Sequence, residues 1–244
     1  PSGSELFEGV PFVIDGGASN PGMGTVDLDP GDGMAVAQRV LDGVAVDQRA
    51  MIRGGSLTPS IQEIGGTLRS QPDKSLLFDP GHLEDFLRRT APRCADNLFS
   101  GNVVWGAGTA PDLGFHDPGA PPWDRRQRPR MTFIDGDLTV AGAVTGAGML
   151  VVTGRMVVTG GLAFNGIVLV LGEGNLSVCG PSTEIRGGAL VGNLPGYSGS
   201  SGVARLTFGD GARLTFDRDM IRLGLSLLPA LQVSFREITA TMDP

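Results

Sequence analysis

Glycine recurs at every sixth residue from Gly136 to Gly172, and this spacing restricts the possible folds more than any other feature. The glycines are Gly136, Gly142, Gly148, Gly154, Gly160, Gly166 and Gly172. An apolar residue lies two places after each of the first six, and another lies four places after each, except where Gly146 stands. Alternation with a period of two is typical of strands, because successive side chains point to opposite faces. The repeat predicts short strands joined at glycine corners.

A hexapeptide period is one signature of a parallel β-helix, in which the inward side chains of stacked coils bury a continuous core. The alternative is an antiparallel meander, whose hairpins prefer Asn-Gly or Asp-Gly turns. Asp135-Gly136 and Asn165-Gly166 match that preference, but the other corners read Ala-Gly, Thr-Gly and Leu-Gly. We therefore predict a mainly β fold with a few helices, built on a short parallel β-helix whose handedness stays open.

The rest of the chain predicts elements that pack on the repeat. We expect residues 1–125 to form a mixed α/β region and residues 126–244 to form the β-helix and its C-terminal cap, together one structural unit. Helices are predicted over residues 34–46 and 218–228, and a third is predicted to begin at Pro80 with Asp79 as its N-cap. A closing strand is predicted over residues 231–238. Residues 106–130 predict an irregular crossover. Because an uncapped β-helix exposes unpaired strand edges, these parts are expected to act as caps.

The composition excludes some partners. The net charge is −7, and acidic chains gain little from nucleic-acid phosphates, which are bound by Lys and Arg. No stretch approaches the roughly 20 apolar residues of a membrane-spanning helix. Because the chain starts at Pro1 without a methionine, we expect that a signal, an anchor or another segment preceded it.

Two cysteines lie far apart in the sequence, at Cys94 and Cys179. In an exported protein such a pair predicts one long-range disulfide, because its spacing matches no zinc or redox motif. The alternative is two buried free thiols.

The sequence predicts no catalytic residue. His82 and His116 both lie outside the hexads, whereas hexapeptide-repeat acyltransferases need a histidine as general base. Both are therefore expected to be ordinary surface residues. The chain also lacks a Gly-x-Ser-x-Gly elbow and a phosphate-binding P-loop.

Carboxylates supply the candidate metal ligands. Asp27, Asp29 and Asp32 lie in one Gly-rich turn, and their oxygens predict a possible calcium site. A solvated acidic turn is the alternative. A polysaccharide-cleaving β-helix would need an acidic cluster beside a basic residue. Two acidic pairs occur, Asp135/Asp137 and Asp217/Asp219, but the sequence places no basic residue of the repeat beside either.

A basic run lies just after Trp123. It consists of Arg125, Arg126, Arg128 and Arg130. This run predicts contact with an acidic partner or polymer, or else a solvated loop stabilised by its own ion pairs.

Three stretches resemble a known family. They are Met131-Thr-Phe-Ile-Asp-Gly-Asp-Leu-Thr-Val, Gly146-Ala-Gly-Met-Leu-Val-Val-Thr-Gly, and Leu162-Ala-Phe-Asn-Gly-Ile-Val-Leu-Val-Leu-Gly. Together with Pro11-Phe-Val-Ile-Asp-Gly, Leu214-Thr-Phe-Asp-Arg-Asp and Val233-Ser-Phe-Arg-Glu-Ile, they resemble the exported C-terminal regions of PilX-like pilus-assembly proteins. The resemblance is strongest over 131–193.

The resemblance implies a minor-pilin-like subunit of a type IV pilus or related filament, outside the cell, whose partners are other filament subunits. It carries over no catalytic residue and no cofactor, and it implies a membrane contact only through an N-terminal helix that this sequence lacks. The alternatives are a surface adhesin or carbohydrate-binding β-helix with Trp105, Trp123 and Tyr197 as candidate ligands, a β-helix enzyme, and a cytoskeletal polymer of the bactofilin type.

Overall fold

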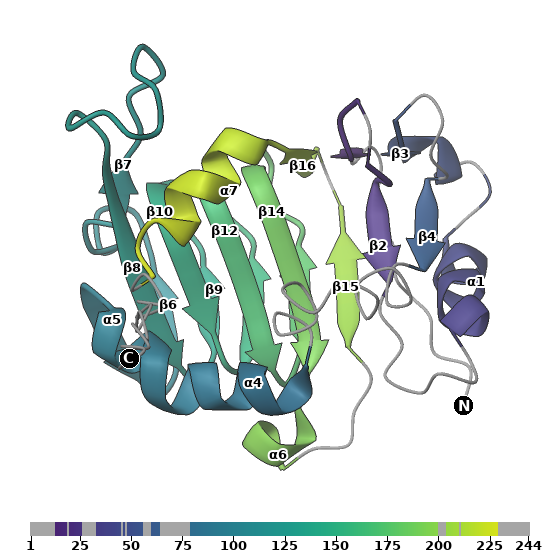
Figure 1. The fold of residues 1–244 in the computed structure, drawn as a ribbon, viewed down its shortest axis with the longest axis horizontal. Helices are drawn as coiled ribbons and strands as arrows, with labels where there is room; N and C mark the ends of the chain where they lie inside the picture. The colour runs from purple at the N-terminus through teal and green to yellow at the C-terminus, as the bar shows by residue number, and fades with distance from the viewer. Residues whose placement is uncertain are drawn as a thin grey trace, which may run out of the picture.

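The computed structural model describes residues 13–18, 20–25, 33–44, 46, 48–55, 60–63, 79–199, 204–209 and 211–228. The fold is mainly β, with strands gathered in parallel sheets and helices lying against them (Figure 1). The helices are α1 (Gly33–Gly43), η1 (Arg49–Met51), α4 (Pro80–Asp85), η2 (Phe86–Thr90), α5 (Ala91–Cys94), α6 (Pro195–Ser198) and α7 (Arg218–Leu225). The predicted mainly β class with a few helices is confirmed.

Two parallel sheets make up most of the molecule. The first sheet has the order β3 (Ile52–Arg53), β1 (Val13–Asp15), β16 (Arg213–Phe216), β14 (Glu184–Asn193), β12 (Leu162–Gly172), β10 (Val144–Val152), β8 (Arg128–Asp135) and β5 (Asn97–Ser100). The second has the order β15 (Arg205–Phe208), β13 (Asn175–Val178), β11 (Arg155–Val158), β9 (Leu138–Val140) and β6 (Val103–Trp105). From β8 to β16 the chain alternates between the two. We call a strand of the first sheet and the strand of the second that follows it a rung.

Successive rungs in the repeat are 18 residues apart. Val144 of β10 pairs with Leu162 of β12, and Met156 of β11 pairs with Leu138 of β9. One rung therefore holds three hexads. Within the two main sheets only the short β7 (Gly114–Phe115) pairs antiparallel, with β8, so the antiparallel meander is wrong.

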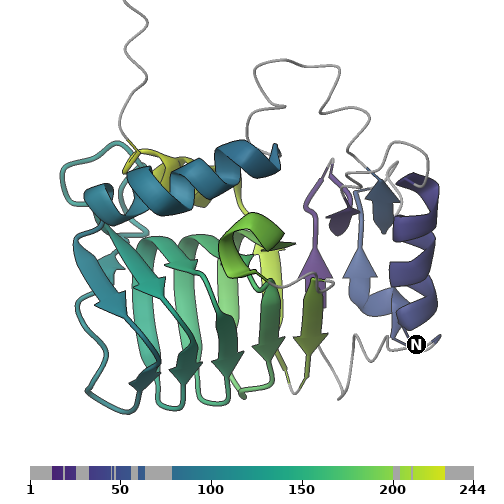
Figure 2. The ribbon, with the colours of Figure 1, turned by 90° about the horizontal axis from the view of Figure 1, so that it is seen from below.

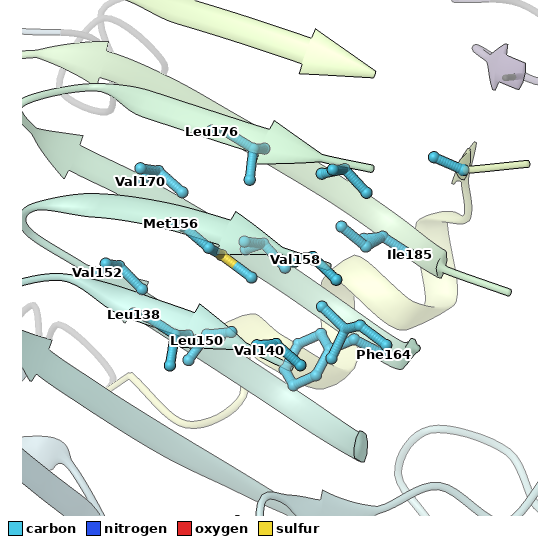
Figure 3. Packing of buried hydrophobic residues seen from close by; sticks show 14 of the residues in the cluster. Leu138, Val140, Leu150, Val152, Met156, Val158, Phe164, Val170, Leu176 and Ile185 are labelled. Carbon is cyan, nitrogen blue, oxygen red and sulfur yellow. The ribbon is translucent and has the colours of Figure 1, made fainter. Parts of the chain in front are cut away.

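The apolar hexad positions fill the space between the two sheets. Their side chains are buried and point toward one another across the core (Figure 3). The core residues at the predicted positions are Leu138, Val140, Val144, Leu150, Val152, Met156, Val158, Leu162, Phe164, Val168, Val170 and Leu176. This arrangement confirms the inward face that the alternation predicts, because residues two apart on a strand share a face.

Gly146, the one break in the apolar pattern, lies beside a large core side chain. It pairs with Phe164 on the next rung, and a Cβ on Gly146 would lie 3.1 Å from the Phe164 ring and 2.6 Å from Leu113 Cβ. The missing side chain thus leaves room for the phenyl ring. The hexad also shifts after Gly172, because Arg155 pairs with Asn175, 20 residues on.

Two hexad glycines, Gly148 and Gly166, lie inside strands rather than between them, and Gly187 continues their column. Gly148, Gly166 and Gly187 are register partners on β10, β12 and β14, with φ of +124°, +147° and +134°. A Cβ on Gly166 would lie 2.0 Å from the carbonyl oxygen of Gly148. Three successive rungs thus repeat a backbone conformation that L side chains rarely adopt. Because all three glycines share this conformation, the strands stay paired on both sides of it.

Among the described residues before α4, the N-terminal region holds helix α1 and four short strands, and its strands add rungs to the stack. β1 pairs in parallel with β16, and β1 also pairs with β3. β2 (Met23–Thr25) pairs with β4 (Ile61–Glu63) in a sheet of their own. Both pairs are offset by 38 residues, so β1–β2 and β3–β4 are successive rungs. One incomplete rung separates these two from the rung β14–β15. It consists of β16 alone, because β16 is followed by α7 instead of a second strand.

The first rung in space also comes from outside the predicted repeat. β5 pairs with β8 and β6 pairs with β9, each offset by 35 residues. Trp105 of β6 is buried in the core and meets Phe99 edge-on, with ring centroids 6.4 Å apart. The stack therefore begins at residue 97, ahead of the expected boundary at 126.

Helices cover the outer face of the first sheet rather than only capping its ends. Figure 2 shows the α4–α5 segment and α7 lying above the row of strands. A second apolar cluster fills this layer; it consists of Leu87, Ala91, Met131, Phe133, Met149, Val151, Ile167, Leu171 and Leu194. These strands are thus apolar on both faces, as expected for parallel sheets buried on both sides.

The three predicted helices are present. Asp79 caps α4 by accepting a hydrogen bond from the backbone nitrogen of His82 at 3.0 Å, as expected. Asp217 caps α7 in the same way, accepting from Asp219 and Met220. The predicted closing strand, 231–238, lies outside the described residues.

Gln127 holds the crossover segment together. This buried side chain donates to the carbonyl oxygens of Asp117 and Ala120, both at 2.8 Å, and accepts from the Asp117 nitrogen at 3.0 Å. It also bonds His116 Nδ1 at 3.0 Å. The segment is therefore ordered by one amide side chain, although it has little secondary structure.

Candidate functional site

A hollow of about 510 Å³ lies over the last two strands of the first sheet, β8 and β5. Its lining residues are Leu87, Arg88, Pro92, Leu98, Ser100, Phe133, Asp135 and Tyr197. The helical segment η2–α5 forms one wall and the short helix α6 supplies Tyr197. We call it the end hollow.

The floor of the end hollow follows the strand register. Leu98 pairs with Phe133 and Ser100 pairs with Asp135, so an apolar row and a polar row lie side by side. Phe133 is covered by the helices, but Leu98 is 57% exposed. The apolar floor therefore continues past the helix layer, toward the end of the stack.

The polar side of the end hollow is a hydrogen-bonded chain. The Tyr197 hydroxyl donates to Asp135 Oδ1 at 2.8 Å, and Thr153 Oγ1 donates to the same oxygen at 3.1 Å. Arg88 lies 5.4 Å above the Tyr197 ring and bonds the carbonyl oxygen of Gly196. Together these contacts fasten α6 to the helix layer and to β8.

The environment of Tyr197 keeps its hydroxyl protonated. Burial and the hydrogen bond to Asp135 raise the pKa of Tyr197 to about 12, in that order of importance. A phenol with so high a pKa is a hydrogen-bond donor at neutral pH rather than a base or nucleophile. The group therefore serves to position α6 and to present a polar rim.

Because Tyr197 is the one tyrosine in the sequence, its titration can be followed directly. We expect the tyrosinate absorbance of the folded protein to rise with a midpoint near pH 12, and that of the unfolded chain near pH 10. The folded state holds the proton more tightly, so this contribution to stability is complete below about pH 10 and lost as the pH rises toward 12. Tyr197→Phe should remove that alkaline loss, measured as denaturant midpoint against pH. Equal midpoints in the folded and unfolded chains would contradict the hydrogen bond between Tyr197 and Asp135.

The two cysteines are free thiols, so the predicted disulfide is wrong for this structure. Cys94 ends α5 and packs, half-buried, in the apolar layer outside the first sheet. Cys179 directly follows β13 of the second sheet and is exposed. Because the apolar core lies between the two sheets, the thiols are on opposite sides of the stack. The alternative of two buried thiols is also wrong, since only Cys94 is even partly covered.

The candidate calcium ligands Asp27, Asp29 and Asp32 lie outside the described residues. Within the part of the chain that the structure describes, no three acidic, His or Cys residues gather at metal-binding distance. Asp137 accepts a hydrogen bond from the backbone nitrogen of Arg155 at 2.8 Å, and Asp217 accepts one from the side-chain Nη2 of Arg186 at 2.8 Å. These carboxylates therefore make structural contacts between distant parts of the chain, and the fold places Arg186 beside Asp217.

Two of the four arginines in the basic run form ion pairs with neighbouring carboxylates. Arg126 contacts Asp124 at 3.2 Å and Asp117 at 3.5 Å, and its guanidinium holds the pKa of Asp124 below the ordinary value. The other two placements are Arg130 Nε on Asp112 at 3.0 Å and Arg128 over the Phe115 ring at 5.6 Å. These contacts favour the loop-stabilising interpretation of the run.

The three aromatic candidates for ligand binding differ in their exposure to solvent. Trp105 is buried in the core, and the Tyr197 hydroxyl is hydrogen-bonded in the end hollow. Trp123 is 79% exposed on the crossover segment. Of the three, only Trp123 presents a free ring face to a ligand.

Most of the end hollow was not expected from the sequence. Leu98, Ser100 and Arg88 belong to stretches without a recognisable motif, and the strand pairing brings them beside Asp135. The one usable signal was that β8 has apolar residues on both faces. Met131 and Phe133 point outward and Ile134 points inward, so a second layer has to cover the outer face.

Comparisons with known proteins give no relative: no protein-family model, curated protein or solved structure matches this chain. Among the described residues, no helix is both long and apolar enough to span a bilayer.

Proposed function

We propose that this protein is a non-enzymatic structural module, minor-pilin-like, that takes part in a type IV pilus or related extracellular filament. In this proposal the two parallel sheets are the walls of a short β-helix, and the rungs are its coils. The partners are other filament subunits, and no cofactor is required.

The alternation of the chain between two parallel sheets supports the β-helix. Four features fit it: the 18-residue register, the hexad positions that point into one core, the in-register column of Gly148, Gly166 and Gly187, and the strands β1 and β16 that join the ends of the sequence. The first sheet pairs without a break from β3 to β5, so backbone hydrogen bonds join all the rungs into one elongated body, which suits a filament component.

The observation that carries the proposed role is the difference between the ends of the stack. One end is covered by α1 and charged residues, and the other presents the edges of β5 and β6 beside the end hollow. Unpaired sheet edges are templates for association, so a module with one such end is suited to assembly.

The filament role can be tested in the organism that encodes the protein. An epitope can be inserted at Gly119, which is exposed in the crossover segment and lies outside the strands. We expect the tagged full-length protein to sediment with filaments sheared from the cell surface and to leave that fraction when the main filament subunit is deleted. Recovery in the cytoplasmic fraction would contradict the role and favour a bactofilin-type polymer.

Trp123 favours a second candidate, carbohydrate binding by a surface adhesin. Its ring is exposed on a segment that Gln127 orders, and it precedes Arg125, which is also exposed. Aromatic faces stack on sugars, and arginine binds carboxylates in bidentate fashion. Binding to an array of acidic and neutral glycans that Trp123→Ala abolishes would support this candidate, and an array without any binding would remove it.

A further inference from the structure

The two ends of the stack differ in how their sheet edges are protected. β5 is the terminal strand of the first sheet and β6 is the terminal strand of the second. Among the described residues, no strand pairs with the outer edge of either. Parallel strands that stop without a partner leave a row of backbone N–H and C=O groups on that edge.

The β5–β6 end lacks the usual protection of an edge. Residues 97–111, which hold both strands and their connection, contain no Asp, Glu, Lys or Arg, although 18% of the whole chain is charged. Leu98 is 57% exposed and Val104 is 64% exposed. Natural edges usually carry charge, proline or a covering element, so this edge is built like a surface that becomes buried.

The opposite end is protected in the usual ways. Its terminal strand β3 has two residues and ends in the exposed Arg53, and β4 ends in Glu63. Helix α1 packs against β4, at the far end of the molecule in Figure 1. A short strand, charges and a covering helix are together an effective block to edge pairing.

We propose that the β5–β6 end binds the same end of a second copy of this chain and forms a two-fold dimer. A two-fold axis perpendicular to both the strands and the stack pairs β5 with β5 of the second copy and β6 with its β6, each antiparallel. Both sheets then continue across the interface. Leu98 and Val104 of the two copies lie along it, and the open side of the end hollow faces the partner.

Charge favours a second copy as the occupant. The protein carries a net charge of −7, so most of its surface repels another copy. In a two-fold interface each residue meets its own equivalent region, so a charged patch would face like charge. Residues 97–111 form an uncharged surface and avoid that repulsion. The charged β3–β4 end would not.

Sedimentation equilibrium of the purified chain, with reductant present so that Cys179 cannot cross-link, tests this dimer. We expect reversible dimerisation of the wild type and a shift toward monomer of at least tenfold in the dissociation constant for Leu98→Lys/Val104→Lys. Both side chains are exposed, so the double variant should keep the wild-type circular dichroism and melting temperature. Val46→Lys, on a residue 79% exposed in the N-terminal region, is the matched control and should dimerise like the wild type.

The dimer proposal rests on the filament role in one respect: both assume that the β5–β6 end serves assembly. The dimer and the filament role can nevertheless fail separately. A wild type that stays monomeric at the highest soluble concentration overturns the dimer without affecting filament sedimentation. A dimer that survives Leu98→Lys/Val104→Lys, or that Val46→Lys disrupts, also overturns it, because association then uses another surface.

Discussion

Replacing Gly166 with alanine is expected to destabilise the protein by at least about 3 kcal/mol. Gly166 has φ of +147°, and an added Cβ would lie 2.0 Å from the carbonyl oxygen of Gly148. The obstacle is backbone on a neighbouring rung, so the strands would have to separate to admit the methyl group. For a chain of this size, the loss corresponds to a fall in melting temperature of roughly 6–12 °C.

Gly161→Ala is the matched control. Its Cβ would meet nothing closer than the Pro181 oxygen at 3.7 Å, and its φ lies outside the left-handed region. We expect a change in melting temperature of no more than a few degrees, because the methyl group has space. Equal losses for the two variants would show that Gly166 is not in a close-packed column.

Phe164→Ala is expected to cost about 3–5 kcal/mol of unfolding free energy. The ring is 2% exposed at the centre of the core, and it fills the space that Gly146 leaves on the neighbouring rung. With no side chain at Gly146 to move in, the cavity cannot collapse, which places the cost toward the upper part of the range. Denaturant unfolding followed by circular dichroism measures it.

Phe115→Ala provides the comparison for Phe164. Phe115 is 49% exposed, and its main contact is the Arg128 guanidinium. Its removal should cost less than about 1 kcal/mol. If both variants lost the same stability, the sheets would not enclose Phe164 between them.

The inward face of the repeat was predictable because each part of its signal is local. A period of two fixes which residues share a face, and a period of six fixes where the backbone needs glycine. Leu150, Val152 and Met156 therefore lie in the core as their spacing predicted. The capping of α4 by Asp79 was predictable for the same reason, since the contact spans three residues.

Features that depend on distant pairing were missed. Nothing local in Val13–Asp15 indicates that it pairs with Arg213–Phe216, because parallel neighbours need no sequence proximity. The disulfide prediction failed because Cys94 and Cys179 were judged by spacing alone, without knowing on which side of the stack each lies. The end hollow was missed likewise, since β5 joins β8 across 35 residues.

The parallel stacking of 18-residue rungs underlies both the proposed filament role and the proposed dimer, and paired cysteines test it most directly. Thr139 and Val157 are register partners on the outward face of β9 and β11, and Ser177 follows on β13. In a background of Cys94→Ser/Cys179→Ser, Thr139→Cys/Val157→Cys should form a disulfide on mild oxidation, because neighbouring strands lie about 4.8 Å apart. Thr139→Cys/Ser177→Cys, two strands apart at roughly 10 Å, should stay reduced. A folded protein in which the second pair oxidises and the first does not would contradict the stack.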